Sequence, residues 1–151
     1  MPVGVLMLVQ YYLVDRTLKM RQGKACAQCA HGALIVQKRH CKFSSNVDKE
    51  RIHRHLSENG FDSTSSLDAV ALELQSSFVE TYKAWDEGGN AKVVLKADAE
   101  LLQRAMDEFE FAVEVIDAGF TEVAPGSRTV VVLPVMKKED APDWIQALKL
   151  L

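Results

Sequence analysis

The sequence predicts an α/β fold: one mixed, four-stranded β-sheet with helices on both faces. The N-terminal run VGVLMLVQYYLV is β-branched and aromatic-rich without alternation, which is typical of a central strand covered on both faces. Two further strand-like runs, AKVVLK and FAVEVI, are separated from it by segments with helical periodicity. At 151 residues, 48% of them hydrophobic, the chain suits a single domain over residues 1–151.

Each expected element follows from a local signal. Apolar runs between turn residues predict strands at Val3–Val14, Ala91–Lys96, Phe111–Ile116 and Arg128–Pro134. Periodicity and capping signals predict helices at Lys24–Lys38, at Leu67–Asp86, after Asp98, and within Asp140–Leu151 near Pro142. Ser66 is the candidate cap of the second helix, and Gly88-Gly89-Asn90 ends it. The polar stretch His40–Ser66 is expected to be an irregular or partly helical insertion.

Composition limits the classes of function. The formal net charge of −3 gives no general attraction to nucleic acid, so RNA binding would need a local basic patch. Cys26 and Cys29 form a C-x-x-C inside a predicted helix, but a second ligand pair is absent. We therefore expect no metal and no cofactor, and reduced, buried cysteines in a cytoplasmic protein. The run Met1–Val14 is too short to span a bilayer, and it lacks the basic region and cleavage site of a signal peptide.

The first predicted helix carries a narrow polar stripe. Between Lys24 and Val36 nearly every residue is small or apolar, except Lys24, Gln28 and His31. At 100° per residue these three side chains fall within an arc of roughly 60°. Such a stripe is costly on a closely packed helix unless it meets partners, a ligand or solvent in a cleft. It begins just after a strand, at the sheet edge where α/β proteins bind ligands. A stripe that simply faces solvent is the alternative that remains open.

Several segments of the sequence resemble a known family. The segment LKMRQGKACAQCAH, Leu18–His31, is similar to a motif of type 2 peptidyl-tRNA hydrolases. Further similar segments follow in the family's order: Trp85 with Gly88-Gly89 and AKVVLK, Asp117-Ala118-Gly119 with Thr121, Ala124–Ser127 with Thr129, and the terminal LKLL. The resemblance covers the chain outside residues 40–66. It implies the mixed-sheet fold, no metal or cofactor, and hydrolysis of the ester between a nascent peptide and the 3′ adenosine of its tRNA. The implied role lies in translation, in ribosome rescue.

The resemblance also implies site residues. It places the catalytic residues at Lys24, Gln28, His31, Asp117 and Thr121, so it selects the same helix stripe that the physical argument selects. These five side chains are expected to share one cleft. The implied partner is peptidyl-tRNA, for which the candidate binding residues near the site are Lys19, Arg21 and Arg128. A homodimer is left open, and no membrane partner is expected.

Three departures from the family pattern leave two functions open. Asp15, Gln22 and Phe120 stand where the family usually has cations, and Arg21 restores one positive charge. In the first function, a water activated near Asp117 hydrolyses the ester while Lys24 stabilises the oxyanion. In the second, the protein is a catalytically lapsed relative that binds RNA or protein, because Asp117 also suits a strand-ending turn. Cys29 as a nucleophile is a weaker alternative, since it points about 140° away from Lys24 on the helix.

Overall fold

The sheet is built around a central first strand. The computed structural model describes residues 6–58, 69–120 and 122–151. In it β1 (Leu8–Asp15) pairs in parallel with β2 (Lys92–Ala97) and antiparallel with β4 (Arg128–Val132). Strand β3 (Val113–Ile116) continues the sheet beside β4, giving the order β2-β1-β4-β3, and the short β5 (Met136–Lys137) pairs with the start of β1. The predicted mixed sheet is therefore confirmed, with β1 in its interior.

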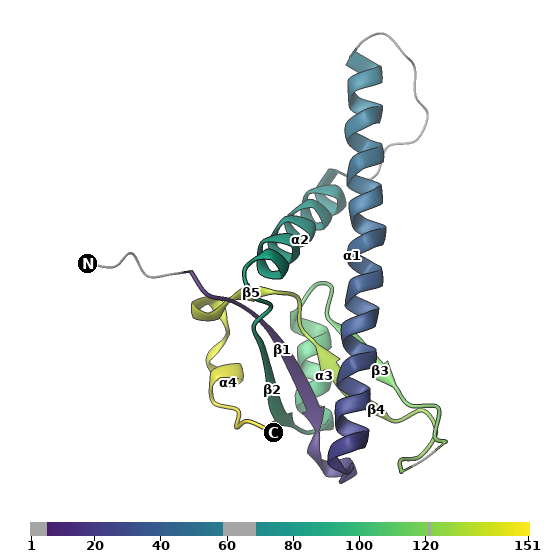
Figure 1. Ribbon diagram of the computed structural model, residues 1–151, viewed down its shortest axis with the longest axis vertical. Coiled ribbons are helices and arrows are strands. Elements are labelled where there is room, and N and C mark those ends of the chain that lie inside the picture. Colours follow the sequence, from purple (N-terminus) through teal and green to yellow (C-terminus); the bar gives the residue numbers. More distant parts are fainter. Residues whose placement is uncertain (1–5, 59–68, 121) are drawn as a thin grey trace, which may run out of the picture.

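Alternate residues of β1 face two different hydrophobic clusters. Tyr12 and Val14 pack with residues of α1 (Gln22–Glu58) and α2 (Ala69–Glu87). Tyr11 and Leu13 pack on the other face, with residues of α3 (Ala99–Glu108) and α4 (Asp143–Gln146). Both faces of the strand are buried, which explains why its sequence shows no alternation. Figure 1 shows α1 and α2 on one side of the sheet and α3 and α4 on the other, as the sequence predicts.

The boundaries of several elements differ from the prediction. The first strand was expected from Val3, but it begins at Leu8, and residues 1–5 lie outside the described part of the chain. The proposed cap Ser66 also lies outside it. Asp98 does cap α3, because its carboxylate accepts a hydrogen bond from the Leu101 amide. Two short 3₁₀ helices, η1 (Arg16–Leu18) and η2 (Lys138–Asp140), and strand β5 have no counterpart in the prediction.

Helix α1 is far longer than predicted. It was expected to end at Lys38, before an irregular or partly helical insertion, but it continues unbroken to Glu58. Figure 1 shows that its second half extends beyond the sheet, with α2 alongside. Val36, His40, Phe43 and Val47 recur at helical spacing and face α2, where the His40 ring stacks on Tyr82. The polar composition of this segment conceals that stripe, which is why the sequence predicts an irregular or partly helical insertion here.

The packing of α2 also differs from its predicted face. A repeat of four residues advances 400° per step, so it drifts about 40° around the helix each time. Accordingly Phe78 and Tyr82 are buried, whereas Val70 and Leu74 at the start of the same repeat are exposed. The buried set is instead completed by Trp85, whose indole N–H donates to the backbone oxygen of Ala91.

Close approach of α1 to the sheet generates a stability prediction. A Cβ on Gly32 would lie 2.5 Å from Val132 Cγ2 and 3.3 Å from Val115 Cγ2, two buried and rotationally restricted valines. Overpacking costs about 1–3 kcal/mol, while alanine gains up to about 1 kcal/mol over glycine in a helix. We therefore expect Gly32→Ala to lower the free energy of unfolding by about 1–2 kcal/mol, measured by urea denaturation.

Gly23 provides the matched control for this substitution. It lies in the first turn of the same helix, and a Cβ there would meet no atom within 4 Å. Gly23→Ala should leave the urea midpoint unchanged or raise it. If Gly32→Ala is as stable as Gly23→Ala, α1 does not pack on the sheet as closely as described.

Candidate active site

A groove of about 640 Å³ lies between α1 and the end of β3. Lys24, Gln28 and His31 line it from the helix, and Asp117 and Phe120 line it from the loop that follows the strand. The structure thus brings together four of the five residues that the sequence selects as catalytic. The fifth, Thr121, lies outside the described residues.

The loop after β3 is held in a fixed shape by its own backbone. The amide of Asp117 donates to the carbonyl of Ser127, and the amide of Gly126 donates back to the carbonyl of Asp117. Gly119 has a φ of +80°, and a Cβ there would lie 2.5 Å from the Pro125 ring. Glycine is therefore required at this turn, on both conformational and steric grounds. This closed loop fixes the backbone from which the Asp117 carboxylate projects toward α1.

The Asp117 carboxylate is the centre of the polar contacts in the groove. Its Oδ1 accepts hydrogen bonds from Lys24 Nζ at 2.5 Å and from Gln28 Nε2 at 3.2 Å. Its Oδ2 accepts from the backbone N–H of Gly119 at 2.7 Å. The Lys24 ammonium, followed by the Gly119 and Gln28 hydrogen bonds, lowers the pKa of Asp117 against the opposing effect of burial. The carboxyl group is therefore ionised at neutral pH and poorly suited to removing a proton completely.

Gln28 is held in one orientation by a residue that the sequence analysis did not select. Its side chain is 3% exposed, and its Oε1 accepts a hydrogen bond of 2.8 Å from the hydroxyl of Thr129 on β4. With its oxygen occupied in this way, the amide presents its nitrogen to Asp117. Thr129 is fully buried and belongs to the quoted family motif, which was the only signal in the sequence for it.

The outer part of the groove is more apolar and more exposed. His31 is exposed on the groove wall, next to Leu34 and Ile35 of the same helix. Phe120 is 91% exposed at the rim, and Ile116 is half-exposed beside it. An exposed aromatic ring beside a polar site is a surface on which a nucleic acid base stacks well.

The three candidate tRNA-binding residues do not share one surface. Arg21 is exposed at the start of α1, where Glu122 accepts from its backbone amide and lies 3.8 Å from its guanidinium. Lys19 is exposed just before it. Arg128 contacts Glu114 at 2.6 Å and Gln103 of α3 at 2.8 Å, so its side chain lies on the face of the sheet opposite α1. The structure therefore does not bring Arg128 to the groove.

Asp15, one of the departures from the family pattern, has a structural explanation. Its side chain is buried, and its Oδ1 accepts from the backbone amide of Thr17 at 2.9 Å and from the Thr17 hydroxyl at 2.6 Å. It caps η1 and so shapes the turn that leads into α1.

The cysteines are free but not all buried. Cys26 and Cys41 are exposed, so the expectation that Cys26 would be buried is wrong. Cys29 is half-buried against the core. Burial, and to a lesser extent the charge of the nearby Cys26, raises the pKa of its thiol to about 11. A thiol of this kind is a poor nucleophile at neutral pH. Within residues 6–58, 69–120 and 122–151, no group of three or more His, Cys, Asp or Glu side chains could hold a metal ion.

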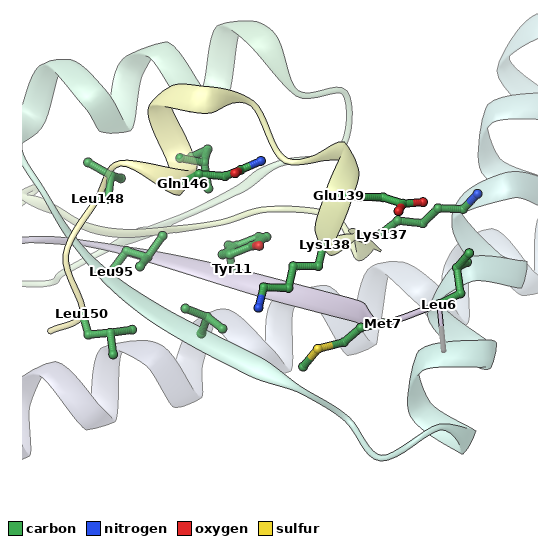
Figure 2. Close-up of a pocket in the computed structure, with 12 residues that line it drawn as sticks. Leu6, Met7, Tyr11, Leu95, Lys137, Lys138, Glu139, Gln146, Leu148 and Leu150 are labelled. Atoms are coloured by element: carbon green, nitrogen blue, oxygen red, sulfur yellow. The ribbon is translucent and has the colours of Figure 1, made fainter. Parts of the chain in front are cut away.

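A second pocket lies on the other face of the sheet. It has a volume of about 730 Å³ and is lined mainly by apolar residues of β1, β2 and the C-terminal segment. Figure 2 shows Tyr11, Leu95 and Leu148 along its walls, with Lys138 extending across it. Because Tyr11 points away from α1, this pocket is separated from the Lys24–Asp117 groove by the sheet. It does not contain the polar cluster described above.

Comparisons with known proteins agree with this geometry. The model of the family "Peptidyl-tRNA hydrolase PTH2" matches residues 8–151. Similar proteins include "Peptidyl-tRNA hydrolase 2, mitochondrial" of Bos taurus, 31% identical over 78% of this chain and 50% of that protein, and "Probable peptidyl-tRNA hydrolase 2" of Schizosaccharomyces pombe, 32% identical over 78% of this chain and 44% of that protein. "Peptidyl-tRNA hydrolase" of Thermococcus onnurineus is 27% identical over 80% of this chain and 77% of that protein.

The chain spans about half the length of the first two of these relatives. Among the described residues, no helix is long and apolar enough to cross a membrane. The family match extends over both the α1 motif and the loop after β3, and so includes every element that forms the groove. The chain belongs to the peptidyl-tRNA hydrolase PTH2 family.

Proposed function

We propose that this protein hydrolyses the ester bond of peptidyl-tRNA, releasing free tRNA and peptide. The observation that carries the proposal is the Lys24–Asp117 contact inside a groove, formed by residues 93 positions apart in a chain of the PTH2 family. A relative that had lost catalysis would share the family fold without needing an intact polar cluster.

In the proposed mechanism Lys24 stabilises the developing oxyanion. Its ammonium has three N–H donors, of which one is directed at Asp117. The remaining donors are available to an ester carbonyl oxygen in the groove. The Lys24 side chain is only 13% exposed, so its charge is screened less by water than that of a surface lysine.

Asp117 orients the attacking water rather than removing its proton completely. An ionised carboxylate offers about four acceptor positions, and Lys24, Gln28 and Gly119 occupy three of them. The remaining position on Oδ2 can hold a water close to the carbonyl that Lys24 binds. His31 lies one helical turn beyond Gln28 on the same wall, where it can accept the proton that the water loses. Thr121 is kept as a candidate on the ground of its motif alone.

Phe120, at the rim of the groove, is the proposed contact for the base of the terminal nucleotide. In the proposed complex the terminal adenine stacks on this exposed ring, which stands where the family pattern usually has a cation. Lys19 and Arg21 remain candidates for phosphate contacts at the start of α1. A homodimer stays an open alternative, and a cytoplasmic location stays a prediction. Light scattering of the purified protein and imaging of the tagged full-length chain would test them.

The direct test measures turnover of an N-blocked aminoacyl-tRNA by the purified protein. Lys24→Met should lower kcat by about 10²- to 10³-fold, as expected when an oxyanion donor is lost. Asp117→Asn should lower kcat by about 10²-fold or more because the water and the ammonium lose their anionic partner. Both variants should bind deacylated tRNA within a few-fold of the unmodified protein. Binding without any turnover by the unmodified protein would favour the alternative, an RNA- or protein-binding module that has lost catalysis.

Cys29→Ser serves as the control for a covalent mechanism. Because burial raises the pKa of this thiol, we expect the substitution to leave kcat within about threefold of the unmodified value. Dialysis against EDTA should likewise leave the rate unchanged, since the proposed mechanism uses no metal. An inactive Cys29→Ser protein that still unfolds cooperatively at the same urea concentration would instead identify Cys29 as the nucleophile.

A further inference from the structure

Helix α1 carries three exposed lysines that the proposed mechanism does not use. Lys38, Lys42 and Lys49, here called the lysine track, are all exposed. On an ideal helix they lie with Lys24 within an arc of roughly 40°. This arc is about 120° away from the centre of the face that packs on the sheet and α2, so the track continues the line of the catalytic stripe along the open side of the helix.

The track is physically continuous with the candidate active site. The groove that contains Lys24 and Asp117 is lined at its far end by Ile35 and Lys38. These two residues also line a second groove, of about 610 Å³, which runs on past Lys42 toward the turn between α3 and β3. A strand of nucleic acid that leaves the active site along α1 therefore passes Lys38 and then Lys42.

The track lysines have no acidic partner among the described residues. Within the described part of the chain, none of Lys38, Lys42 and Lys49 forms an ion pair, whereas Arg21, Arg51 and Arg128 each lie within 4 Å of a carboxylate. The one acidic residue that lines the second groove is Glu110. On α1, Asp48 lies about 100° around the helix from Lys49, and it contacts Arg51 instead.

The length of this line fits a polynucleotide better than a single nucleotide. From Lys24 to Lys49 the helix rises about 37 Å, at 1.5 Å per residue. A duplex strand carries a phosphate about every 3.4 Å along its axis, so this distance corresponds to roughly ten phosphates. A terminal adenosine with its ester would occupy only the first part of it.

We propose that the lysine track binds the phosphates of the tRNA acceptor end, leading away from the 3′ nucleotide held at Lys24 and Asp117. The inference rests on the proposed function, because it assumes that the ester lies in the groove. It also assigns a role to the extension of α1 beyond Lys38, the part of the chain that falls outside the family motifs. In this arrangement the extended helix supplies the positive charge that Asp15, Gln22 and Phe120 do not.

The test compares two substrates and two variants. The substrates are an N-acetylaminoacyl-tRNA and the same N-acetylaminoacyl ester carried on the trinucleotide CCA. The first variant, Lys42→Gln/Lys49→Gln, removes two track charges and keeps helix propensity nearly constant. The control, Lys83→Gln/Lys149→Gln, removes two exposed lysines that line neither groove, so the net charge of the two variants is the same.

The track variant should raise KM for the full-length tRNA substrate about tenfold at low salt. It should also lower the salt dependence of tRNA binding by about 1.4 to 1.8 in the log–log slope, the contribution of two phosphate contacts. Turnover of the CCA ester should stay unchanged, and the control variant should match the unmodified protein on both substrates. Equal behaviour of track and control variants would overturn the proposal, and so would an equal loss by the track variant on both substrates.

The experiment separates this proposal from the proposed function. If the unmodified protein cleaves neither substrate, the hydrolase proposal fails, and binding of deacylated tRNA, measured by fluorescence anisotropy, then decides on the track. A tenfold weaker affinity of the track variant relative to the control variant would still support the track. Equal affinities of the two variants would overturn it.

Discussion

The contact between Lys24 and Asp117 joins the two parts of the chain on which the site depends. One residue lies in the first turns of α1, and the other lies where β3 ends. Removing two charges from water is costly, and it is tolerated only when the remaining hydrogen-bonding positions are filled. Gln28 and the Gly119 amide fill two of them, and Thr129 fixes the Gln28 amide in the orientation that this requires. The site is therefore a network rather than an isolated ion pair.

The rest of the fold serves to bring these two segments into register. A central β1, buried on both faces, delivers the chain through the Asp15-capped turn into α1. Strand β4 pairs with both β1 and β3, so it sets the distance between the helix stripe and the loop after β3. Gly32 lets α1 lie close enough to the sheet for Gln28 to reach Thr129. These contacts set the positions of the site residues, and none of them takes part in the proposed reaction.

Much of this arrangement was predictable from particular residues. The unalternating run before Asp15 predicted a central strand, and Asp98 predicted a helix start, because both signals are local. The stripe of Lys24, Gln28 and His31 was visible as an anomaly within one helix.

The length of α1 could not be predicted because its buried stripe includes His40, whose burial depends on α2. By strand alternation Arg128 would share the α1 face with Val130, but an irregularity in the β3–β4 pairing turns it to the other face, and no local signal in the sequence marks that irregularity. Thr129 acts only through Gln28, which no local pattern reveals.

The central claim is that the Lys24 ammonium holds Asp117 ionised in the groove. Titration of the Asp117 carboxyl carbon by NMR tests it most directly, in the unmodified protein and in Lys24→Met. In the unmodified protein the pKa of Asp117 should lie below its ordinary value of about 3.9, and it should rise when the ammonium is removed. An Asp117 pKa at or above the ordinary value in the unmodified protein, or one that Lys24→Met leaves unchanged, would contradict this description of the site.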